Sequence, residues 1–575
     1  WQKELIGGTV HRTMAQASVS GGSNGTRYLM SGTYQRENTV FPGESGYQKG
    51  SVLLNLDHSS DDGRFRLHFS GNYVVDNNDL PAADLTRISR SLAPNAPALY
   101  DEDGELNWAD NTWNNPLAEL ESRFSSNSKT LTTNGTASYA VLKGVTAKLN
   151  LGYTDARMDD SRVLPSTRYN PAFGADSRYS SVYKGTSSRT SWIVEPQLQW
   201  QGDMGPLQLD VLLGSTFQQQ DQQQLGLYAQ GFPSNELLGD ISAATTLNVN
   251  LDSGTEYRYQ AIFGRINLNY RKIYILNLTA RRDGSSRFGP GNQFANFGAI
   301  GAAWLFSEEN FIKEALPVIS YGKLRGSYGT TGNDQIGDYQ FWETYSLGGT
   351  NYDGVSVLRP TRLFNPDLPL SMETGLEVDA GFELAPGLKI SGSVRKSVLT
   401  NLTDNKRLNS GSPLPRVHSN WPLYDLAGQN GHIYSLTSSY ARNLGPGIYG
   451  RAHAGLLEPF FAGIGAEILF KPVQWPIGIG LDIHRVRQRD YDMRFDLQDY
   501  ETTVGHISLY YNAGGMFDIE VNAGRYLAGD WGATTTVSRK FGSGWEVGGY
   551  ATLTDVPFDI FGEGSFDKAI YVSVP

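Results

Sequence analysis

Cysteine is absent from the 575 residues, and no apolar run approaches the ~18 residues that a membrane-spanning helix needs. Without cysteine the chain has no disulfides, no thiolate zinc sites and no cysteine nucleophile. Charged residues make up only 19%, which argues against a disordered, charge-rich chain. Acidic residues outnumber basic ones by 59 to 48, so nucleic acid is not the expected partner.

Glycine and aromatic residues are plentiful, with 65 Gly and 12% aromatics. Apolar and polar residues also alternate along many segments, as an extended chain requires when its two faces meet different environments. In one such segment Val145, Leu149 and Leu151 interleave with Lys148 and Asn150. In a membrane barrel the apolar set faces lipid and the polar set faces the lumen.

Several alternating segments are about ten residues long, the length that a tilted barrel strand needs to cross a membrane. A soluble sandwich or propeller also gives alternation, but its strands are usually shorter. Short Gly/Pro/Asn turns alternate with longer polar stretches, which we expect to be loops at 76–128, 155–190 and 219–256. The sequence therefore predicts an all-β, transmembrane antiparallel β-barrel of roughly 20–24 strands in the bacterial outer membrane, with lipid as a partner.

A series of motifs resembles the barrel of SusC/RagA-type TonB-dependent outer-membrane transporters over residues 1–380. The strongest of them is the block FGRINLNYRKIYILNLTARRDGSSRFGPGNQFANFGAIGAAWLFSEENF (263–311). Phe288 and Phe294 within it are expected to lie at an aromatic girdle or a loop base. Other motifs follow in the family's order, among them LYDEDGELNW (99–108), KLRGSYGTTGNDQIGDYQF (323–341) and FNPDLPLSMETGLEVDAGFE (364–383).

This resemblance implies nutrient import, of glycans or peptides, with a SusD-like lipoprotein outside the membrane. The family's N-terminal plug is not expected here, because barrel-like segments begin near Gln16. TonB is therefore a partner only if a plug exists upstream. A water-filled lumen or one blocked by folded-in loops such as 76–128 is expected, and those loops are predicted to be polar rather than core-forming.

The C-terminal third carries a second resemblance, from about residue 384 to the end. The segments GIYGRAHAGLLEPFFAGIGAEILFKP (447–472), GRYLAGDWGAT (524–534) and FGEGSFDK (561–568) are similar to YjbH, an outer-membrane protein family linked to exopolysaccharide export. That family is also interpreted as barrels. The resemblance implies a polysaccharide as an alternative substrate.

The two resemblances meet within 365–388, which we expect to form one strand of a continuous barrel, containing Val378, Phe382 and Leu384. The predicted organisation is a SusC-like barrel region at 1–380 and a YjbH-like barrel region at 381–575. Three functions remain open: a SusC-type importer without its plug, a YjbH-type exporter, and a hybrid barrel, natural or engineered, with no transport role.

Residues for catalysis are not evident in the sequence. The eight His lie apart along the chain, and neither HExxH nor a phosphate-binding GxxxxGK[ST] motif occurs. GGSNG (21–25) matches GxSxG around Ser23, but a strand-like segment rather than a helix follows, which favours a turn. We therefore predict that the chain is not an enzyme and has no catalytic residues, metal site or cofactor.

Two sets of residues are candidate contacts for a solute. Aromatic rings on predicted loops can stack on sugar rings, or can simply pack the loops together; these are Trp108, Trp113, Tyr339 and Trp342. Arginines in the run 485–492 are candidate contacts for an anionic polysaccharide and are expected to face the lumen or a loop; these are Arg485, Arg487 and Arg489.

Overall fold

The computed structural model describes residues 1–43, 45–352, 355–366, 371–400, 417–418, 423–424, 431–514, 517–541, 544–557 and 566–573. Its strands are mostly long and antiparallel to their neighbours. Glu563, within the FGEGSFDK motif, lies outside these described residues. The strands are β1 (Arg12–Ser23), β2 (Thr26–Asn38), β3 (Gly46–Ser59), β4 (Phe65–Pro81), β5 (Arg123–Leu142), β6 (Val145–Leu164), β7 (Ser181–Met204), β8 (Leu207–Gln230), β9 (Thr246–Tyr270), β10 (Tyr274–Ser285), β11 (Phe294–Trp304), β12 (Tyr321–Asn333), β13 (Thr344–Tyr352), β14 (Val355–Arg362), β15 (Ser371–Ala385), β16 (Leu388–Thr400), β17 (His432–Gly445), β18 (Ile448–Leu456), β19 (Phe461–Phe470), β20 (Ile477–Arg489), β21 (Leu497–Asn512), β22 (Asp518–Arg525), β23 (Trp531–Lys540), β24 (Glu546–Thr554) and β25 (Asp567–Ser573).

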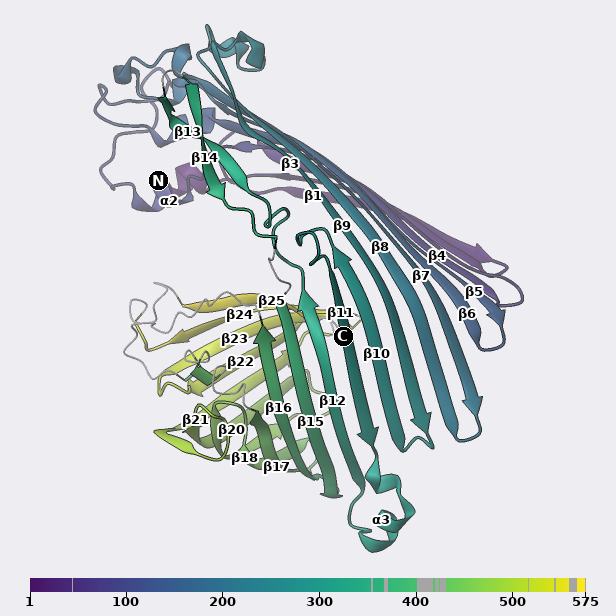
Figure 1. Ribbon diagram of the computed structural model, residues 1–575. Helices are drawn as coiled ribbons and strands as arrows, with labels where there is room; N and C mark the ends of the chain where they lie inside the picture. Colours follow the sequence, from purple (N-terminus) through teal and green to yellow (C-terminus); the bar gives the residue numbers. More distant parts are fainter. Residues whose placement is uncertain are drawn as a thin grey trace.

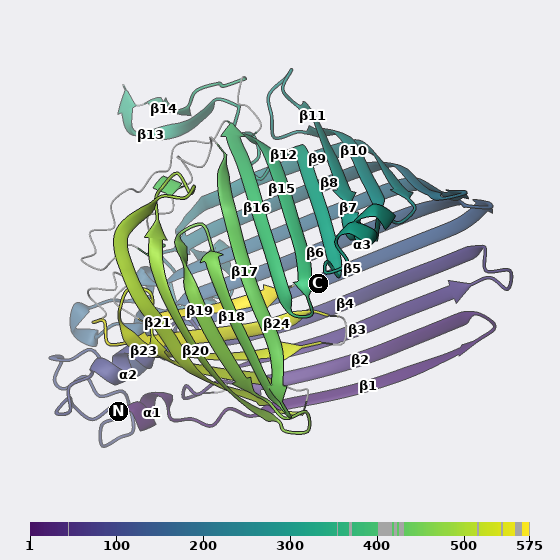
Figure 2. The same ribbon diagram turned by 90° about the horizontal axis from the view of Figure 1, so that it is seen from below.

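One sheet of 23 strands contains every strand except the hairpin β13–β14, which forms a two-stranded sheet of its own. Each strand of the large sheet pairs with the next one along the chain, and β12 pairs with β15. The sheet curls round an interior (Figures 1 and 2). Within the described residues, β1 pairs with β2 and β25 pairs with β24. The predicted fold class and strand number are confirmed.

Helices are short and lie before β1 or in the connections between strands. None of the helices that the structure describes is long and apolar enough to cross a membrane. The helical elements are α1 (Gln2–Ile6), α2 (Thr86–Ser91), α3 (Asn310–Ala315) and the 3-10 turns η1 (Pro116–Glu121), η2 (Ser166–Arg168), η3 (Pro171–Phe173), η4 (Ser177–Tyr179), η5 (Asn235–Leu237), η6 (Ile241–Ala243) and η7 (Phe306–Glu308).

The two ends of the sheet differ in their connections, as predicted. Connections at one end are short turns such as 24–25, 143–144, 205–206 and 386–387, although 305–320 at the same end is longer and carries α3. Those at the other end are mostly long and include 82–122, 165–180 and 231–245. Ser23 ends β1, and Asn24 and Gly25 follow with φ angles of 49° and 76°. This is the left-handed backbone of a tight hairpin turn, so GGSNG is a turn and not a nucleophile elbow.

The predicted loop boundaries were wrong, because the strands continue into all three predicted loops. The Gln-rich stretch 218–224, most of which falls in the expected loop 219–256, lies inside β8 and pairs with both β7 and β9. Gln219 donates hydrogen bonds to Asp221 (3.0 Å) and Glu256 (3.1 Å). Long polar side chains on neighbouring strands can form hydrogen bonds with one another. A strand of polar residues can therefore continue beyond the length that is needed to cross the membrane.

The long connection 82–122 is not simply polar, contrary to expectation. Leu85, Leu99 and Leu117 pack with Leu5 of α1 into a buried cluster, each with 5% exposure or less. Trp113 and Trp1 pack against this cluster. The leucines are widely spaced in the sequence and share no periodicity, so their association becomes visible only in the fold.

The two faces of the strands agree with the predicted inside and outside sets. On β6, Leu149, Leu151 and Tyr153 are exposed to between 36% and 47% on one face, as apolar residues that meet lipid must be. On the opposite face Thr136 of β5 donates a hydrogen bond to Asn150 (3.0 Å). Polar groups on that face hydrogen-bond to one another across strands.

The strand at the junction of the two resemblances, β15, is paired on both sides as expected. Val378 lies opposite Gly326 of β12 and Val394 of β16, and Phe382 continues the same face. On the other face Asp379 pairs with Arg325 of β12 (2.7 Å). Glu377 pairs with Arg395 of β16 at the same distance. Charge pairs therefore join β15 to both regions.

We expect Leu149→Arg to impair insertion and Lys148→Glu to have little effect. Arginine facing lipid near the midplane costs about 2–4 kcal/mol, whereas residue 148 lies on the polar face. Folding yields in lipid vesicles, followed by heat-modifiable gel mobility, measure the difference. Equal yields for the two variants would contradict the assignment of the faces.

Candidate functional site

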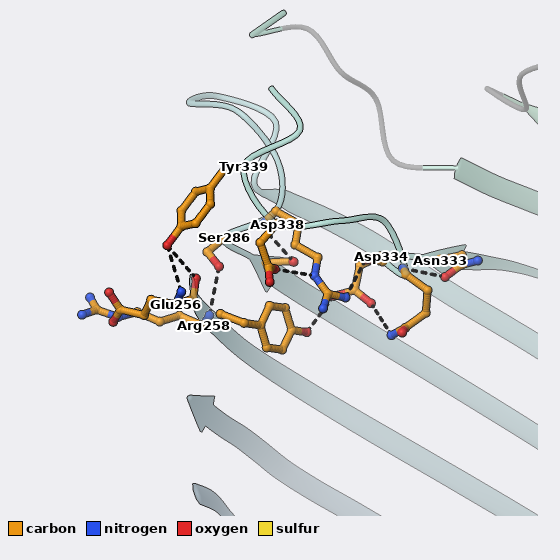
Figure 3. Close-up of polar contacts among 11 residues, drawn as sticks. Glu256, Arg258, Ser286, Asn333, Asp334, Asp338 and Tyr339 are labelled. Carbon is orange, nitrogen blue, oxygen red and sulfur yellow. Dashed lines mark hydrogen bonds and ion pairs between the residues drawn. The ribbon is translucent and has the colours of Figure 1, made fainter. Parts of the chain in front are cut away.

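A polar latch ties three segments together where β10 ends, at the long-connection end of the sheet (Figure 3). Arg287, in the connection after β10, donates to the Asp338 carboxylate (2.9 Å) and to the Asp334 carbonyl oxygen (3.0 Å). Its guanidinium lies over the Tyr257 ring of β9, 4.2 Å from the centroid. The Tyr257 hydroxyl donates to Asp334 (2.7 Å). Arg287 is only 16% exposed, so the latch is largely shielded from water.

The latch gives the strongest sequence motif a structural role. Ser286 accepts a hydrogen bond from the Arg258 backbone N–H (2.9 Å), and Phe288 is 2% exposed. Phe288 therefore packs a loop base as expected, whereas Phe294 is 47% exposed. Arg287 was the residue that sequence reasoning missed, since nothing in its neighbours marks it as the centre of the latch.

The latch also positions two of the predicted aromatic residues. The Tyr339 hydroxyl accepts a hydrogen bond from the Glu256 backbone N–H (2.8 Å; Figure 3). Tyr339 stacks on Trp342 with ring centroids 4.9 Å apart and an interplanar angle of 21°. Trp342 is 51% exposed, so part of its surface is open to solvent at the mouth.

The other two predicted aromatics, Trp108 and Trp113, lie in the connection 82–122 and are both half-buried. The packing of Trp113 against the leucine cluster favours a role in holding this connection together. The carbonyl oxygen of Trp113 accepts a hydrogen bond from Asn170 (3.0 Å), which ties the connection to its neighbour. The structure does not bring Trp108 or Trp113 into contact with the Tyr339–Trp342 pair.

Arg485 and Arg487 lie on the outer face of β20, towards the connection 490–496, whereas a position in the lumen or a loop was expected. They continue the row of Leu481 and Ile483, which are 53% and 58% exposed. Arg485 pairs with Glu501 and also donates to Thr503 (3.0 Å). Beyond the apolar band a charge meets water or headgroups, so the outer face tolerates arginine there. An anionic polysaccharide contact at these two residues stays a prediction.

Arg489 differs from the other two arginines, because it is fully buried. Its guanidinium donates to backbone carbonyl oxygens of Ile433 (2.7 Å), Glu458 (2.8 Å) and Met493, and thereby ties together β17 and two loops. Tyr424 donates to the Arg489 carbonyl oxygen (2.7 Å), and burial raises the pKa of this phenol to about 12. No part of the Arg489 side chain reaches solvent in this arrangement, so the structure gives the predicted solute contact at Arg489 no support.

The inner face of β17–β23 borders a cavity of about 820 Å³. Asp482 and Glu520, both in polar sets of alternating segments, are on this wall. The charged residues and histidines that line it are Arg442, Arg451, Glu467, Asp482, His484, His506 and Glu520. Acidic residues outnumber arginines in this set, so the wall favours cations.

Three histidines that are distant in sequence gather beside this cavity. His453 and His484 have ring centroids 4.9 Å apart, and His506 lies 3.3 Å from the Asp482 carboxylate. Ring nitrogens of His453 and His484 and a Glu467 oxygen all lie within 4.8 Å of one another. Sequence reasoning missed this cluster because it depends on the register of β18, β19 and β20. The only hint of this cluster in the sequence was that His484 belongs to the polar, inward-facing set of its alternating segment.

Comparison with known families shows where the C-terminal resemblance lies. Residues 352–575 match the family "YjbH: Exopolysaccharide biosynthesis protein YbjH". The lipoprotein YjbH of Escherichia coli K12 is 38% identical over 190 residues, which cover 31% of this chain and 27% of that protein.

A second group of relatives consists of TonB-dependent receptors. Receptor P3 of Formosa agariphila is 28% identical over 409 residues, covering 67% of this chain and 39% of P3. SusC of Bacteroides thetaiotaomicron is 33% identical over 142 residues, covering 23% of this chain and 14% of SusC. The chain thus spans well under half the length of these curated relatives.

The fold matches that of the RagAB peptide importer in its closed-closed state, with a TM-score of 0.60 at 15% identity. The match covers 97% of this chain and 74% of the RagAB chain. Both resemblances seen in the sequence are thereby confirmed, and the chain is a transporter-like β-barrel protein of the bacterial outer membrane. The receptors and the importer are transport proteins rather than enzymes.

We expect Arg489→Met to destabilise the β17–β21 region by about 3 kcal/mol or more, because several buried carbonyl oxygens lose their donor. Thermal unfolding in detergent, followed by circular dichroism, measures the effect. Arg485→Met is the matched control, since that exposed ion pair contributes about 0–1 kcal/mol. Equal losses of stability in the two variants would contradict the clamp role of Arg489.

Proposed function

We propose that the chain carries an oligomeric polar solute, a glycan or a peptide, into the cell across the outer membrane. The observation that carries this proposal is the alignment with TonB-dependent receptor P3 over 67% of the chain. The peptide importer RagAB, which shares the fold, supports the same class of solute.

The polar inner face of the barrel supports passage of a hydrated solute. Asp210 of β8 accepts hydrogen bonds from Gln199 and Gln201 (both 2.8 Å) and lies 3.5 Å from Arg265. Such groups can exchange hydrogen bonds with hydroxyl or amide groups as readily as with water. The proposal does not depend on a single high-affinity site along the wall.

The mouth aromatics are the proposed first contact for a glycan. Trp342 is exposed and stacked on Tyr339, which the latch holds in place. A rigid aromatic face that is partly open to solvent can cover the apolar C–H surface of a sugar ring. Trp108 is a weaker candidate of the same kind, and Trp113 is already engaged with the leucine cluster.

A SusD-like lipoprotein is the proposed partner at the long-connection end, where the leucine cluster and the latch give the loops a defined shape. TonB acts through a plug segment in this class of transporter, so we assign it no residue of the barrel wall. The proposed division of the chain remains a SusC-like region at 1–380 and a YjbH-like region at 381–575, closed as one barrel.

Export of an exopolysaccharide is the second candidate function. It is favoured by the YjbH match at residues 352–575, which includes all strands that border the cavity. Secretion of polysaccharide by cells that carry the gene, lost on its deletion, would favour export over import. If deletion of the gene changes neither import nor export, the chain is a hybrid barrel with no transport role.

We expect the 575-residue chain to form a weakly cation-selective pore in planar bilayers, because its net charge is −11. Replacing residues 93–114 by a Gly-Ser linker removes part of the leucine cluster and should raise the conductance. Reversal potentials in a salt gradient measure the selectivity. If both proteins insert and neither conducts, an open lumen is excluded and the transport proposal fails with it.

We expect Trp342→Ala to weaken glycan-induced current block by about 3- to 10-fold, the range that an aromatic contact supplies. Concentration series of a neutral oligosaccharide give the half-blocking concentration. Trp342→Phe should retain most of the effect. Trp475→Ala is the matched control, because Trp475 is 56% exposed at the opposite end of the sheet. An equal change in both alanine variants would rule out the mouth contact.

A further inference from the structure

We propose that His453, Glu467 and His484 bind one divalent transition-metal ion of the zinc class on the inner wall of the barrel. The three residues come from β18, β19 and β20, which are consecutive strands of the sheet. This inference is independent of the transport proposal and assigns a ligand to a histidine pair that the transport proposal does not use.

The strand register brings the ligands together. His453 lies directly opposite Gly465, and Gly465 lies directly opposite His484, so the two imidazoles flank one glycine on the same face. Glu467 is two residues further along β19 and therefore points to that same face. Its Oε1 atom lies 3.7 Å from His484 Nε2 and 4.0 Å from His453 Nδ1.

Gly465 provides the space in which the two rings meet. A Cβ atom at this position would lie 2.6 Å from His453 Nε2 and 2.8 Å from His484 Nε2. Any other residue would therefore push the rings away from the glycine. A glycine with an extended backbone in mid-strand weakens the strand, so its presence between two histidines has a structural cost that a binding site would explain.

The orientation of the imidazole rings suits a metal. The Nε2 atom of His484 lies 3.7 Å from Glu467 Oε1, and its Nδ1 atom lies 3.2 Å from the Asp482 carboxylate. His453 Nδ1 is buried and has no hydrogen-bond partner. Buried polar atoms in proteins nearly always have a hydrogen-bond partner. A buried ring nitrogen that has none, and that faces a carboxylate and a second imidazole, is therefore explained by a metal ion bound between them.

The charges around the site balance a divalent ion. Arg451 donates to both Glu467 oxygens (3.0 and 2.6 Å), which places one positive charge nearby. Glu467 and Asp482 supply two negative charges, and Glu520 borders the same cavity. Each carboxylate oxygen has a second lone pair, so Glu467 Oε1 can bind an ion while Arg451 keeps its orientation.

The ligand set selects the kind of ion. Two imidazole nitrogens and one carboxylate oxygen suit Zn²⁺ and its transition-metal neighbours, whereas Ca²⁺ and Mg²⁺ require mainly oxygen ligands. A tetrahedral ion with bonds of about 2.1 Å holds its ligand atoms about 3.4 Å apart. Because the three ligand atoms lie within 4.8 Å of one another, the side chains need to close by at most about 1.4 Å. The fourth position faces the cavity of about 820 Å³, where water or an anionic group of a solute can bind.

The test uses the folded 575-residue chain in detergent, titrated with Co²⁺ and Zn²⁺ after treatment with a chelator. We expect one Co²⁺ per chain, visible d–d absorption typical of a four-coordinate ion, and displacement by Zn²⁺. His453→Ala and His484→Ala should each weaken binding by at least 10-fold. His68→Ala is the matched control, since His68 also lies beside a carboxylate (Asp57, 2.7 Å) but has no second imidazole in that pair.

Gly465→Ala is a second variant, which leaves every ligand in place and fills the space between the rings. It should also weaken Co²⁺ binding at least 10-fold, while heat-modifiable gel mobility reports whether each variant is folded. The proposal is overturned if the wild-type chain binds no ion at micromolar Co²⁺. It is overturned equally if the folded Gly465→Ala variant, or the two histidine variants, bind Co²⁺ as tightly as wild type.

Discussion

Backbone hydrogen bonding in hydrocarbon is the constraint on which the whole molecule depends. Every N–H and C=O group at membrane depth must find a partner within the sheet, because lipid offers none. Among the described residues, β2 to β12 and β15 to β24 meet this requirement as a meander with a partner on both sides of each strand, and β12 pairs with β15. Side chains are therefore free to vary as long as apolar and polar residues alternate. The paired strands then carry everything else: the latch at the mouth, the arginine clamp at β20 and the histidine cluster on the inner wall.

The same constraint explains how two sequence families can share one sheet. Backbone hydrogen bonds between strands do not depend on which family a strand's sequence resembles. Strand β15 therefore needs only the correct alternation of apolar and polar residues to pair with β12 and β16. On its inner face β15 also forms ion pairs with both neighbours, between Asp379 and Arg325 of β12 and between Glu377 and Arg395 of β16. Because of these backbone hydrogen bonds and ion pairs, β15 is paired with its neighbours as continuously as the other strands of the sheet.

The alternation of apolar and polar residues predicted the strands and their faces, but not the strand ends or the contacts between distant segments. Alternation from Val145 to Tyr153 correctly gave the strand, its two faces and the barrel class, since each depends only on period two. Strand ends were not predictable, because Gln218–Gln224 look like a solvated loop until they find partners on both neighbouring strands. The leucine cluster and the burial of Arg489 depend on contacts between distant segments. The pairing of His453 with His484 depends on a register that passes through Gly465, which no single segment reveals.

The unequal length of the strands has a consequence for the shape of the barrel rim. Strand β9 has 25 residues and β5 has 20, whereas β24 has 9 and β25 has 7. At about 3.3 Å per residue the longer strands extend far past a hydrocarbon layer of about 30 Å, even when tilted. The wall is therefore tall on the side of β5–β9 and short on the side of β24 and β25 (Figure 1). The inner surface of the longer strands is thus left uncovered where the opposite wall is short, so the rim of the barrel is stepped rather than level.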